Sequence, residues 1–220
     1  NSSKKEKIVV NYVDYLCTNK DKRNKGLAPR LIYTYAINSQ LNNKSINVYL
    51  FKRESESTQI VPITIYNSYL YNISNLINNV NLLPYKLVRI TSSNINLLYD
   101  SLIDKYNESL LEKQYKLIIL PSYENLKVLI DKQCLYIYIL QMDEIVYGIY
   151  IFRNSEVIYN NSKTIDFIAS NSFYKDREKD KDLINEIFYN GFCECIKEIK
   201  KEGFEKLLFE NISDNTIIKQ

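Results

Sequence analysis

The stretch IVVNYVDYLCTNKDKRNKGLAPRLIYTYAINSQL, residues 8–41, contains three kinds of sequence in succession. Residues 8–17 are rich in β-branched and aromatic side chains, which predicts a strand. Residues 18–26 are polar and basic and predict a loop. The apolar-periodic run that follows predicts a helix to Leu41, with Pro29 in the first turn, where its missing N–H costs nothing. The order is therefore strand, basic loop and helix.

The end of this loop carries a candidate phosphate-binding motif. Arg23-Asn24-Lys25-Gly26-Leu27-Ala28 fits the Arg-x-x-Gly-x-Gly/Ala loop of coenzyme A acyltransferases. Backbone N–H groups at a helix N-terminus can converge on a diphosphate, and small residues such as Gly26 and Ala28 let the backbone approach it. Four basic side chains favour an anionic ligand: Lys20, Lys22, Arg23 and Lys25. The alternative interpretation is an ordinary solvated loop that leads into a helix.

The composition limits the chemistry that this chain can carry out. It has 220 residues, 45% of them hydrophobic and 25% charged, as is typical of a globular chain of one or two domains. It contains no His, which excludes Ser–His and Cys–His catalysis, His-ligated zinc and imidazole proton shuttling within the chain. Any reaction must therefore use the backbone, carboxylates, Tyr, Lys, Cys or a terminus.

The composition also sets expectations for partners and location. No stretch approaches the roughly 20 apolar residues that a bilayer span needs, and residues 1–10 lack the apolar block of a signal peptide. The net charge of +3 is too small to indicate nucleic-acid binding by itself. The four cysteines, Cys17, Cys134, Cys193 and Cys195, are unpatterned and predict free thiols. We therefore expect a cytoplasmic, monomeric protein without a membrane span, a bound metal or a nucleic-acid partner.

The rest of the chain gives an order of predicted elements. Residues 46–51 predict a second strand, and residues 60–81 a short strand and a turn, with a helix near 74–81 left open. From Pro84 the order is strand, helix, helix, three strands, helix and strand. These elements cover residues 85–90, 94–107, 124–132, 135–140, 145–152, 163–170, 183–202 and 204–210. A tight turn at 141–144 would join two of the strands into an antiparallel hairpin.

The order from Pro84 is the element order of the GNAT acyltransferase fold. Before Pro84, the order strand, loop, helix and strand matches the back half of the same unit. We therefore expect an α+β fold with a mixed α/β sheet, built from tandem GNAT-like units. The first unit, residues 1–83, would lack its front strands, and the second, residues 84–220, would lack its last strands.

Individual residues also resemble one family, the N-myristoyltransferases. The run Val13-Asp14-Tyr15-Leu16-Cys17-Thr18-Asn19-Lys20, continued by Arg23-Asn24-Lys25-Gly26-Leu27-Ala28-Pro29, resembles their Ile-Asn-Phe-Leu-Cys…Lys…Arg-Ser-Lys-Arg-x-Ala-Pro block without a gap. Tyr66-x5-Asn72-x3-Leu76 is similar to their Tyr-Trp-His-Arg-x-Leu-Asn…Leu segment. Gly203-Phe204 followed by Asp214-Asn215 matches their Gly-Phe…Glu-Asn spacing. The resemblance is strong at residues 13–29 and weaker elsewhere.

The resemblance implies transfer of a myristoyl group from myristoyl-CoA to the N-terminal glycine amine of a protein or peptide. The family's oxyanion donors, two backbone N–H groups, fall on Tyr15 and Leu16, and each donor is worth about 3 kcal/mol. No cofactor would be resident, because acyl-CoA is a co-substrate. The implied acyl-CoA contacts are Val13, Asp14, Tyr15, Leu16, Cys17, Thr18, Arg23, Asn24, Lys25, Gly26, Leu27, Ala28 and Pro29. Residues 1–83 would carry this site, and residues 84–220 would contribute to the acceptor-peptide side.

On the acceptor side the chain departs from the family. Tyr66 and Ser68 are the implied acceptor contacts, with Ser68 and Tyr69 standing where the family has His and Arg. The family's catalytic base is its terminal carboxylate, which follows further strands, so we expect this sequence to be truncated at both ends. Asp14, Asp166 and Glu210 are alternative carboxylate bases on predicted strands.

Three other functions stay open. A GNAT-type N-acyltransferase could act on a Lys or a small amine instead of a terminal glycine. A degenerate protein could hold acyl-CoA or a peptide without turnover. A nucleic-acid module that uses the basic loop is the least favoured interpretation.

Overall fold

The computed structural model describes residues 8–13, 16, 18–52, 61–111, 119–173 and 181–219. For residues 105–111 and 181 it describes the backbone alone. Asp14, Tyr15 and Cys17 therefore lie outside the described residues. The chain forms two compact units, Asn1–Ile63 and Thr64–Gln220.

The first unit contains the predicted strand, loop, helix and strand. Strand β1 (Val10–Val13) and strand β2 (Val48–Phe51) form a parallel two-stranded sheet, with Val10 opposite Val48 and Val13 opposite Phe51. Helix α1 (Leu27–Asn42) connects them, as a parallel pair requires. The loop before α1 includes a short 3-10 helix, η1 (Lys20–Lys22), which the sequence analysis did not predict.

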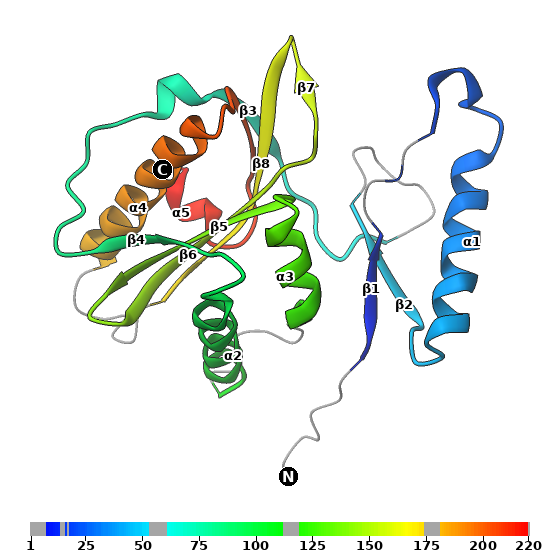
Figure 1. Cartoon of the computed structure of the whole chain (residues 1–220), viewed down its shortest axis with the longest axis horizontal. Helices are drawn as coiled ribbons and strands as arrows, with labels where there is room; N and C mark the ends of the chain where they lie inside the picture. Colours follow the sequence, from blue (N-terminus) through cyan, green and yellow to red (C-terminus); the bar gives the residue numbers. More distant parts are fainter. Residues whose placement is uncertain are drawn as a thin grey trace. The chain divides into compact units, whose positions relative to one another are not determined.

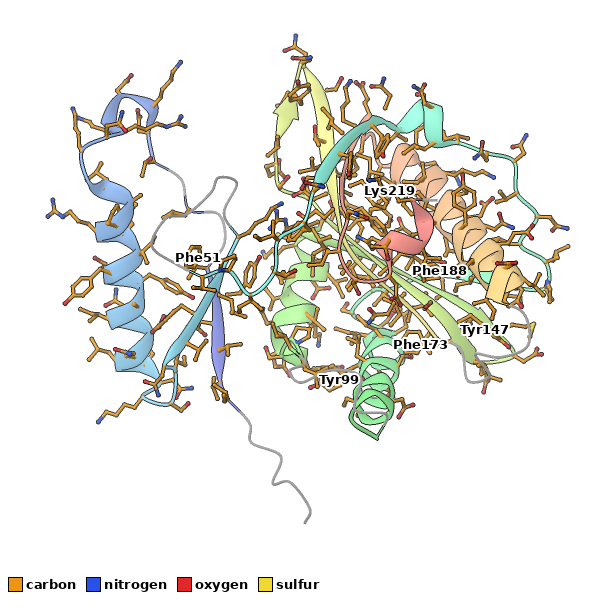
Figure 2. The ribbon with its side chains drawn as sticks, turned by 180° about the vertical axis from the view of Figure 1, so that it is seen from behind. Phe51, Tyr99, Tyr147, Phe173, Phe188 and Lys219 are labelled. Carbon is orange, nitrogen blue, oxygen red and sulfur yellow. The ribbon has the colours of Figure 1, made fainter. Side chains whose placement is uncertain are left out.

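This unit has a small core within its described residues. Ile46 is the one buried side chain there. Helix α1 packs on β2 through Tyr49, whose hydroxyl donates to the Ala36 carbonyl at 2.9 Å and whose ring meets the Tyr35 ring edge-on. Other apolar side chains of α1 are exposed, such as Leu41 at 74%, and Figure 2 shows side chains of this helix that point away from the strands of the first unit.

The second unit is a seven-stranded mixed sheet with helices on both faces (Figure 1). The strands run in the order β3-β9-β8-β6-β5-β4, and β7 pairs with β8. Their bounds are β3 Ser68–Asn72, β4 Lys86–Arg89, β5 Leu135–Met142, β6 Ile145–Arg153, β7 Ile158–Tyr159, β8 Ser162–Ser172 and β9 Lys206–Glu210. The helices are η2 Ile73–Leu76, α2 Ile95–Leu111, α3 Tyr123–Asp131, α4 Lys181–Lys201 and α5 Asn215–Ile218.

The predicted order of elements from Pro84 is confirmed except for one addition, the two-residue strand β7, which was not predicted. Neighbouring strands are antiparallel except β8 and β9, which pair in parallel and are connected through α4. Strand β3 pairs with β9, so the compact second unit begins at Thr64 rather than at Pro84. The assignment of 1–83 and 84–220 as two GNAT-like units stays a prediction.

Local sequence explains two of the boundaries. The β5–β6 hairpin turns at Asp143 and Glu144, whose φ angles of 49° and 65° fit the two-residue type I′ turn that matches strand twist. Helix α4 ends before Gly203, which adopts φ 88° and donates its N–H to the Lys200 carbonyl.

Two hydrophobic clusters cover the two faces of the sheet. Helix α4 supplies Phe192 and Ile196 to a cluster with Phe152, Phe167 and Phe209, whose rings lie 4.7–6.4 Å apart where they meet. Helices α2 and α3 cover the opposite face with aliphatic side chains. Within the described residues, no helix is long and apolar enough to cross a membrane.

Gly191 in α4 tests how closely this helix approaches the sheet. A Cβ there would lie 2.3 Å from the Tyr150 hydroxyl, which is held by its hydrogen bond to the Phe188 carbonyl at 2.7 Å. We therefore expect Gly191→Ala to lower the free energy of unfolding by about 1–3 kcal/mol, although Ala is the better helix former. Urea denaturation measures this change.

Tyr150→Phe provides the control, because it removes the oxygen atom that the new methyl group would meet. The double variant should lose less stability than the two single variants together. If the stability lost by the double variant equalled the sum of the losses of the two single variants, the close approach of Gly191 to Tyr150 would be contradicted.

Candidate functional site

The candidate acyl-CoA site is the connection between β1 and α1. Val13 is the last residue of β1 and pairs with Phe51. Leu16 lies beyond the strand and is 46% exposed, and Thr18 is half-buried. The predicted contacts Asp14, Tyr15 and Cys17 belong to the part of the chain that the structure does not describe. The described pairing of β1 therefore stops just before the predicted oxyanion donors.

A short 3-10 helix shapes the middle of this connection. The Asn19 side chain accepts a hydrogen bond from the Asp21 N–H at 2.9 Å, and the Asn19 carbonyl accepts from the Lys22 N–H at 2.9 Å. Asn commonly caps helices in this way. These hydrogen bonds hold a single 3-10 turn within the basic loop, and the basic side chains of the loop are exposed.

The start of α1 leaves its first N–H groups without a side-chain cap. Asn24 and Gly26 have φ angles of 60° and 68°, in the left-handed region that suits Gly and Asn. Gly26 is the N-cap residue and has no side chain to accept the N–H groups of Leu27 and Ala28. The first turn contains no acidic residue. These N–H groups can donate hydrogen bonds to a bound anion, which the positive end of the helix dipole also favours.

Positive charge stands in front of this helix end. Arg23 and Lys25 are exposed, and among the described residues neither has an ion-pair partner. Pro29 is the third helical residue and lacks an N–H that would need an acceptor. The structure thus brings the predicted phosphate-binding motif, residues 23–28, to one helix N-terminus.

The predicted acceptor residues lie in the second compact unit. Tyr66 is half-buried and precedes β3, and Ser68 is exposed as its first residue, opposite Glu210 of β9. The ammonium of Lys219 lies 3.6 Å from the centroid of the Tyr69 ring. A hydrogen bond from Lys219 lowers the pKa of the Tyr69 hydroxyl below its usual value.

The carboxylates proposed as bases differ in their surroundings. Asp166 is buried and accepts hydrogen bonds from the Arg153 guanidinium at 2.7 Å and from the Ser155 hydroxyl at 3.1 Å. This pair joins β6 and β8, so Asp166 has a structural role. Glu210 is buried in β9, and Asp14 is outside the described residues.

The thiols and carboxylates form no evident metal site. Among the described residues, no group of three or more Cys, Asp or Glu side chains could hold a metal ion. Cys193 and Cys195 are buried in α4, and burial raises the pKa of both thiols. Cys134 is free and partly exposed. The buried thiols are therefore poor nucleophiles.

Comparison with solved structures identifies the fold. The chain matches Saccharomyces cerevisiae N-myristoyltransferase with bound myristoyl-CoA at a TM-score of 0.61 and 16% identity, over 94% of this chain and 54% of that one. A second structure of that enzyme with myristoyl-CoA gives 0.57 and 16%, over 94% and 57%. An aminoglycoside acetyltransferase from an uncultured soil metagenomic sample, in complex with sisomicin, gives 0.43 and 14%, over 57% and 76%.

The chain thus spans about half the length of the yeast enzyme structures. No protein-family model and no curated protein matches the sequence. The predicted fold class, a mixed α/β GNAT-like acyltransferase fold, is confirmed.

Gly26 offers a test of the start of α1. Its φ of +68° strains any residue with a Cβ, although no atom lies within 4 Å of where that Cβ would be. We expect Gly26→Ala to destabilise the first turn by about 1–2 kcal/mol, and Gly26→Asn to cost less, because Asn adopts left-handed conformations more readily. Amide hydrogen exchange of residues 27–31 should be faster in the Ala variant than in the Asn variant. Equal rates would contradict the left-handed N-cap.

Proposed function

We propose that this chain is an acyl-CoA-dependent N-acyltransferase that transfers a myristoyl group to the N-terminal glycine amine of a peptide or protein. The observation that carries the proposal is the uncapped N-terminus of α1, with Arg23 and Lys25 in front of it. The fold, shared with an N-myristoyltransferase that binds myristoyl-CoA, supports the same function.

Recognition of the coenzyme would begin with its phosphates. Among the described residues, no side chain caps the N–H groups of Leu27 and Ala28, and none lies within 4 Å of where a Cβ on Gly26 would be. A diphosphate there would gain hydrogen bonds and the favourable end of the helix dipole. Arg23 and Lys25 would add charge-assisted hydrogen bonds from the loop.

Chemistry would take place where β1 stops pairing with β2. The last described pair is Val13 with Phe51, and Leu16 is exposed outside the strand. The resemblance puts the donors to the thioester oxygen just beyond this last described pair, and we propose the backbone N–H groups of Tyr15 and Leu16 for that role. Such donors stabilise the negative charge that develops on this oxygen, and a chain without His can supply them.

The transfer itself would be a direct attack. The acceptor amine forms a bond to the carbonyl carbon, and the oxyanion collapses as the carbon–sulfur bond breaks. Coenzyme A leaves as the thiolate and takes up one proton, while the nitrogen loses one. Asp166 is committed to Arg153, so we do not assign it as the base.

A different amine acceptor is the second candidate function. Ser68 and Tyr69 occupy the positions where the N-myristoyltransferases, which this sequence resembles, have His and Arg. The Lys219 ammonium contacts the ring of Tyr69. These side chains differ in charge and reach from those they replace, which favours a change of acceptor. A protein that binds acyl-CoA without turnover is the third candidate, and the assay below separates all three.

The loop charges give the first test of this function. We expect Arg23→Glu/Lys25→Glu to weaken binding of a non-hydrolysable myristoyl-CoA thioether by about 10- to 100-fold, as lost charge-assisted hydrogen bonds at an exposed site imply. Isothermal titration calorimetry measures the dissociation constant. Lys44→Glu is the control matched in charge to each single variant, Arg23→Glu and Lys25→Glu, because Lys44 is exposed in the turn after the other end of α1. If Lys44→Glu weakened thioether binding as much, the effect would come from net charge and not from contacts of Arg23 and Lys25.

Release of free coenzyme A thiol tests turnover and acceptor together. With myristoyl-CoA, we expect a peptide with N-terminal glycine to release thiol and its N-acetylated form to release none. Release with lysyl acceptors alone would replace glycine by the second candidate. Binding of the thioether without release from any amine would leave the non-catalytic candidate.

A further inference from the structure

One face of helix α1 carries a row of exposed side chains that no strand of its unit covers. Arg30, Tyr33, Ile37 and Leu41 follow one another at spacings of three or four residues, which places them on one face of the helix. Tyr33 is 68% exposed, Ile37 38% and Leu41 74%, and Arg30 is exposed as well. We call these four side chains the α1 stripe.

The α1 stripe lies on the far side of the helix from β2. Tyr35 marks the near side, because its ring meets the ring of Tyr49 in β2 edge-on. Tyr35 is two residues from both Tyr33 and Ile37, and two residues turn an α-helix by about 200°. The stripe therefore points away from the small sheet of the first unit, as do side chains of α1 in Figure 2.

Positive charge accompanies this apolar row. Arg30 is part of the α1 stripe, and Lys44 is exposed in the turn that follows the helix. Neither has an ion-pair partner among the residues that the structure describes. Helix α1 contains no Asp or Glu, and residues 18–52 contain seven Lys and Arg but one acidic residue, Asp21. The face thus combines apolar side chains with unneutralised cations.

The second unit has the opposite charge balance. Residues 1–63 contain eleven Lys and Arg and five Asp and Glu, whereas residues 64–220 contain eighteen and twenty-one. A negatively charged surface would therefore attract the first unit and repel the second.

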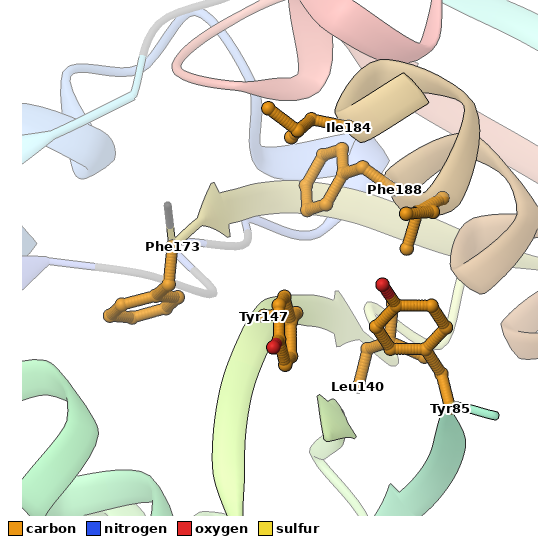
Figure 3. A pocket seen from close by; sticks show the side chains of 7 residues that line it. Tyr85, Leu140, Tyr147, Phe173, Ile184 and Phe188 are labelled. Atoms are coloured by element: carbon orange, nitrogen blue, oxygen red, sulfur yellow. The ribbon is translucent and has the colours of Figure 1, made fainter. Parts of the chain in front are cut away.

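Two cavities of the second unit also differ in chemistry from the α1 stripe. The larger, about 280 Å³, lies between α4 and α5 and includes Asp182 and Glu186 in its lining. The smaller holds about 20 Å³ near the start of α4, and its lining is apolar or aromatic, as at Tyr147, Phe173 and Phe188 (Figure 3). Neither lining contains a Lys or Arg side chain.

A helix with the pattern of α1 is suited to the surface of an anionic membrane. Its apolar and Tyr side chains can enter the boundary between headgroups and acyl chains, while Lys and Arg side chains reach the lipid phosphates. Helix α1 has 16 residues and is about 24 Å long, so it would lie along the surface and not cross it.

We propose that the α1 stripe docks the first unit on an anionic lipid surface. Its apolar side chains would enter the headgroup boundary, and Arg30 and Lys44 would contact lipid phosphates. A second copy of this chain on the same face would bring these cations against their own equivalents, which is unfavourable. The proposal does not depend on the proposed function, because no coenzyme takes part in the docking.

Sedimentation of the full chain with lipid vesicles, without coenzyme, tests the docking. We expect binding to equimolar phosphatidylcholine and phosphatidylglycerol vesicles that weakens with added salt, and much weaker binding to pure phosphatidylcholine. Arg30→Gln/Lys44→Gln should weaken binding to the mixed vesicles by about 25-fold, roughly fivefold for each lost cation. Tyr33→Gln/Leu41→Gln should weaken it by about tenfold or more, because less apolar surface leaves water.

Val128→Gln/Ile158→Gln is the matched control, since both residues are exposed apolar side chains of the second unit, at 53% and 67%. It should leave vesicle binding unchanged, and circular dichroism should show that all variants are folded. The proposal is overturned if the wild-type chain does not bind the mixed vesicles, or if Tyr33→Gln/Leu41→Gln binds them as well as the control does. A dimer in analytical ultracentrifugation that Tyr33→Gln/Leu41→Gln dissociates, without vesicle binding, would assign the stripe to a second copy and also overturn it.

Discussion

Both units contain a pair of parallel strands connected by a helix, and in each unit the described pairing covers four residues of each strand. Val10–Val13 pairs with Val48–Phe51 in one unit, and Thr164–Phe167 pairs with Lys206–Phe209 in the other. A helix returns the chain to the start of the second strand in each case. Buried backbone N–H and C=O groups need partners, so the groups beyond the last pair decide what each unit can do.

The two units meet this need differently. In the second unit, the side chains of Ser213, Asp214 and Asn215 form hydrogen bonds with backbone groups of β8 at Ser170, Ser172 and Phe167, and an aromatic cluster packs the sheet against α4. In the first unit, the described part beyond Val13 is a basic loop that ends at an uncapped helix. Our account therefore places the chemistry in the first unit and a structural role at the corresponding place in the second.

The sequence predicted elements well where local chemistry decides them. Alternating side chains and a tight turn give the β5–β6 hairpin, and Gly203 ends α4. A short strand was predicted within residues 60–81, but the bounds of β3 could not be predicted because its pairing partner, β9, lies near the other end of the chain. The motif at residues 23–28 located the start of α1. No sequence pattern indicated the hydrogen bond from the Asp21 N–H to the Asn19 side chain or the one from the Asn215 amide to the Glu210 carbonyl, because both depend on the folded backbone.

The central claim is that backbone N–H groups after β1 hold the thioester oxygen of a bound acyl-CoA. Infrared difference spectroscopy of myristoyl-CoA labelled with carbon-13 at the thioester carbonyl, mixed with the protein without an acceptor, tests it most directly. Hydrogen bonding to the oxygen weakens the C=O bond, so we predict a carbonyl band at lower wavenumber in the bound state than in water. A bound state with an unshifted or higher-wavenumber band would contradict the claim, as would a spectrum with no bound fraction.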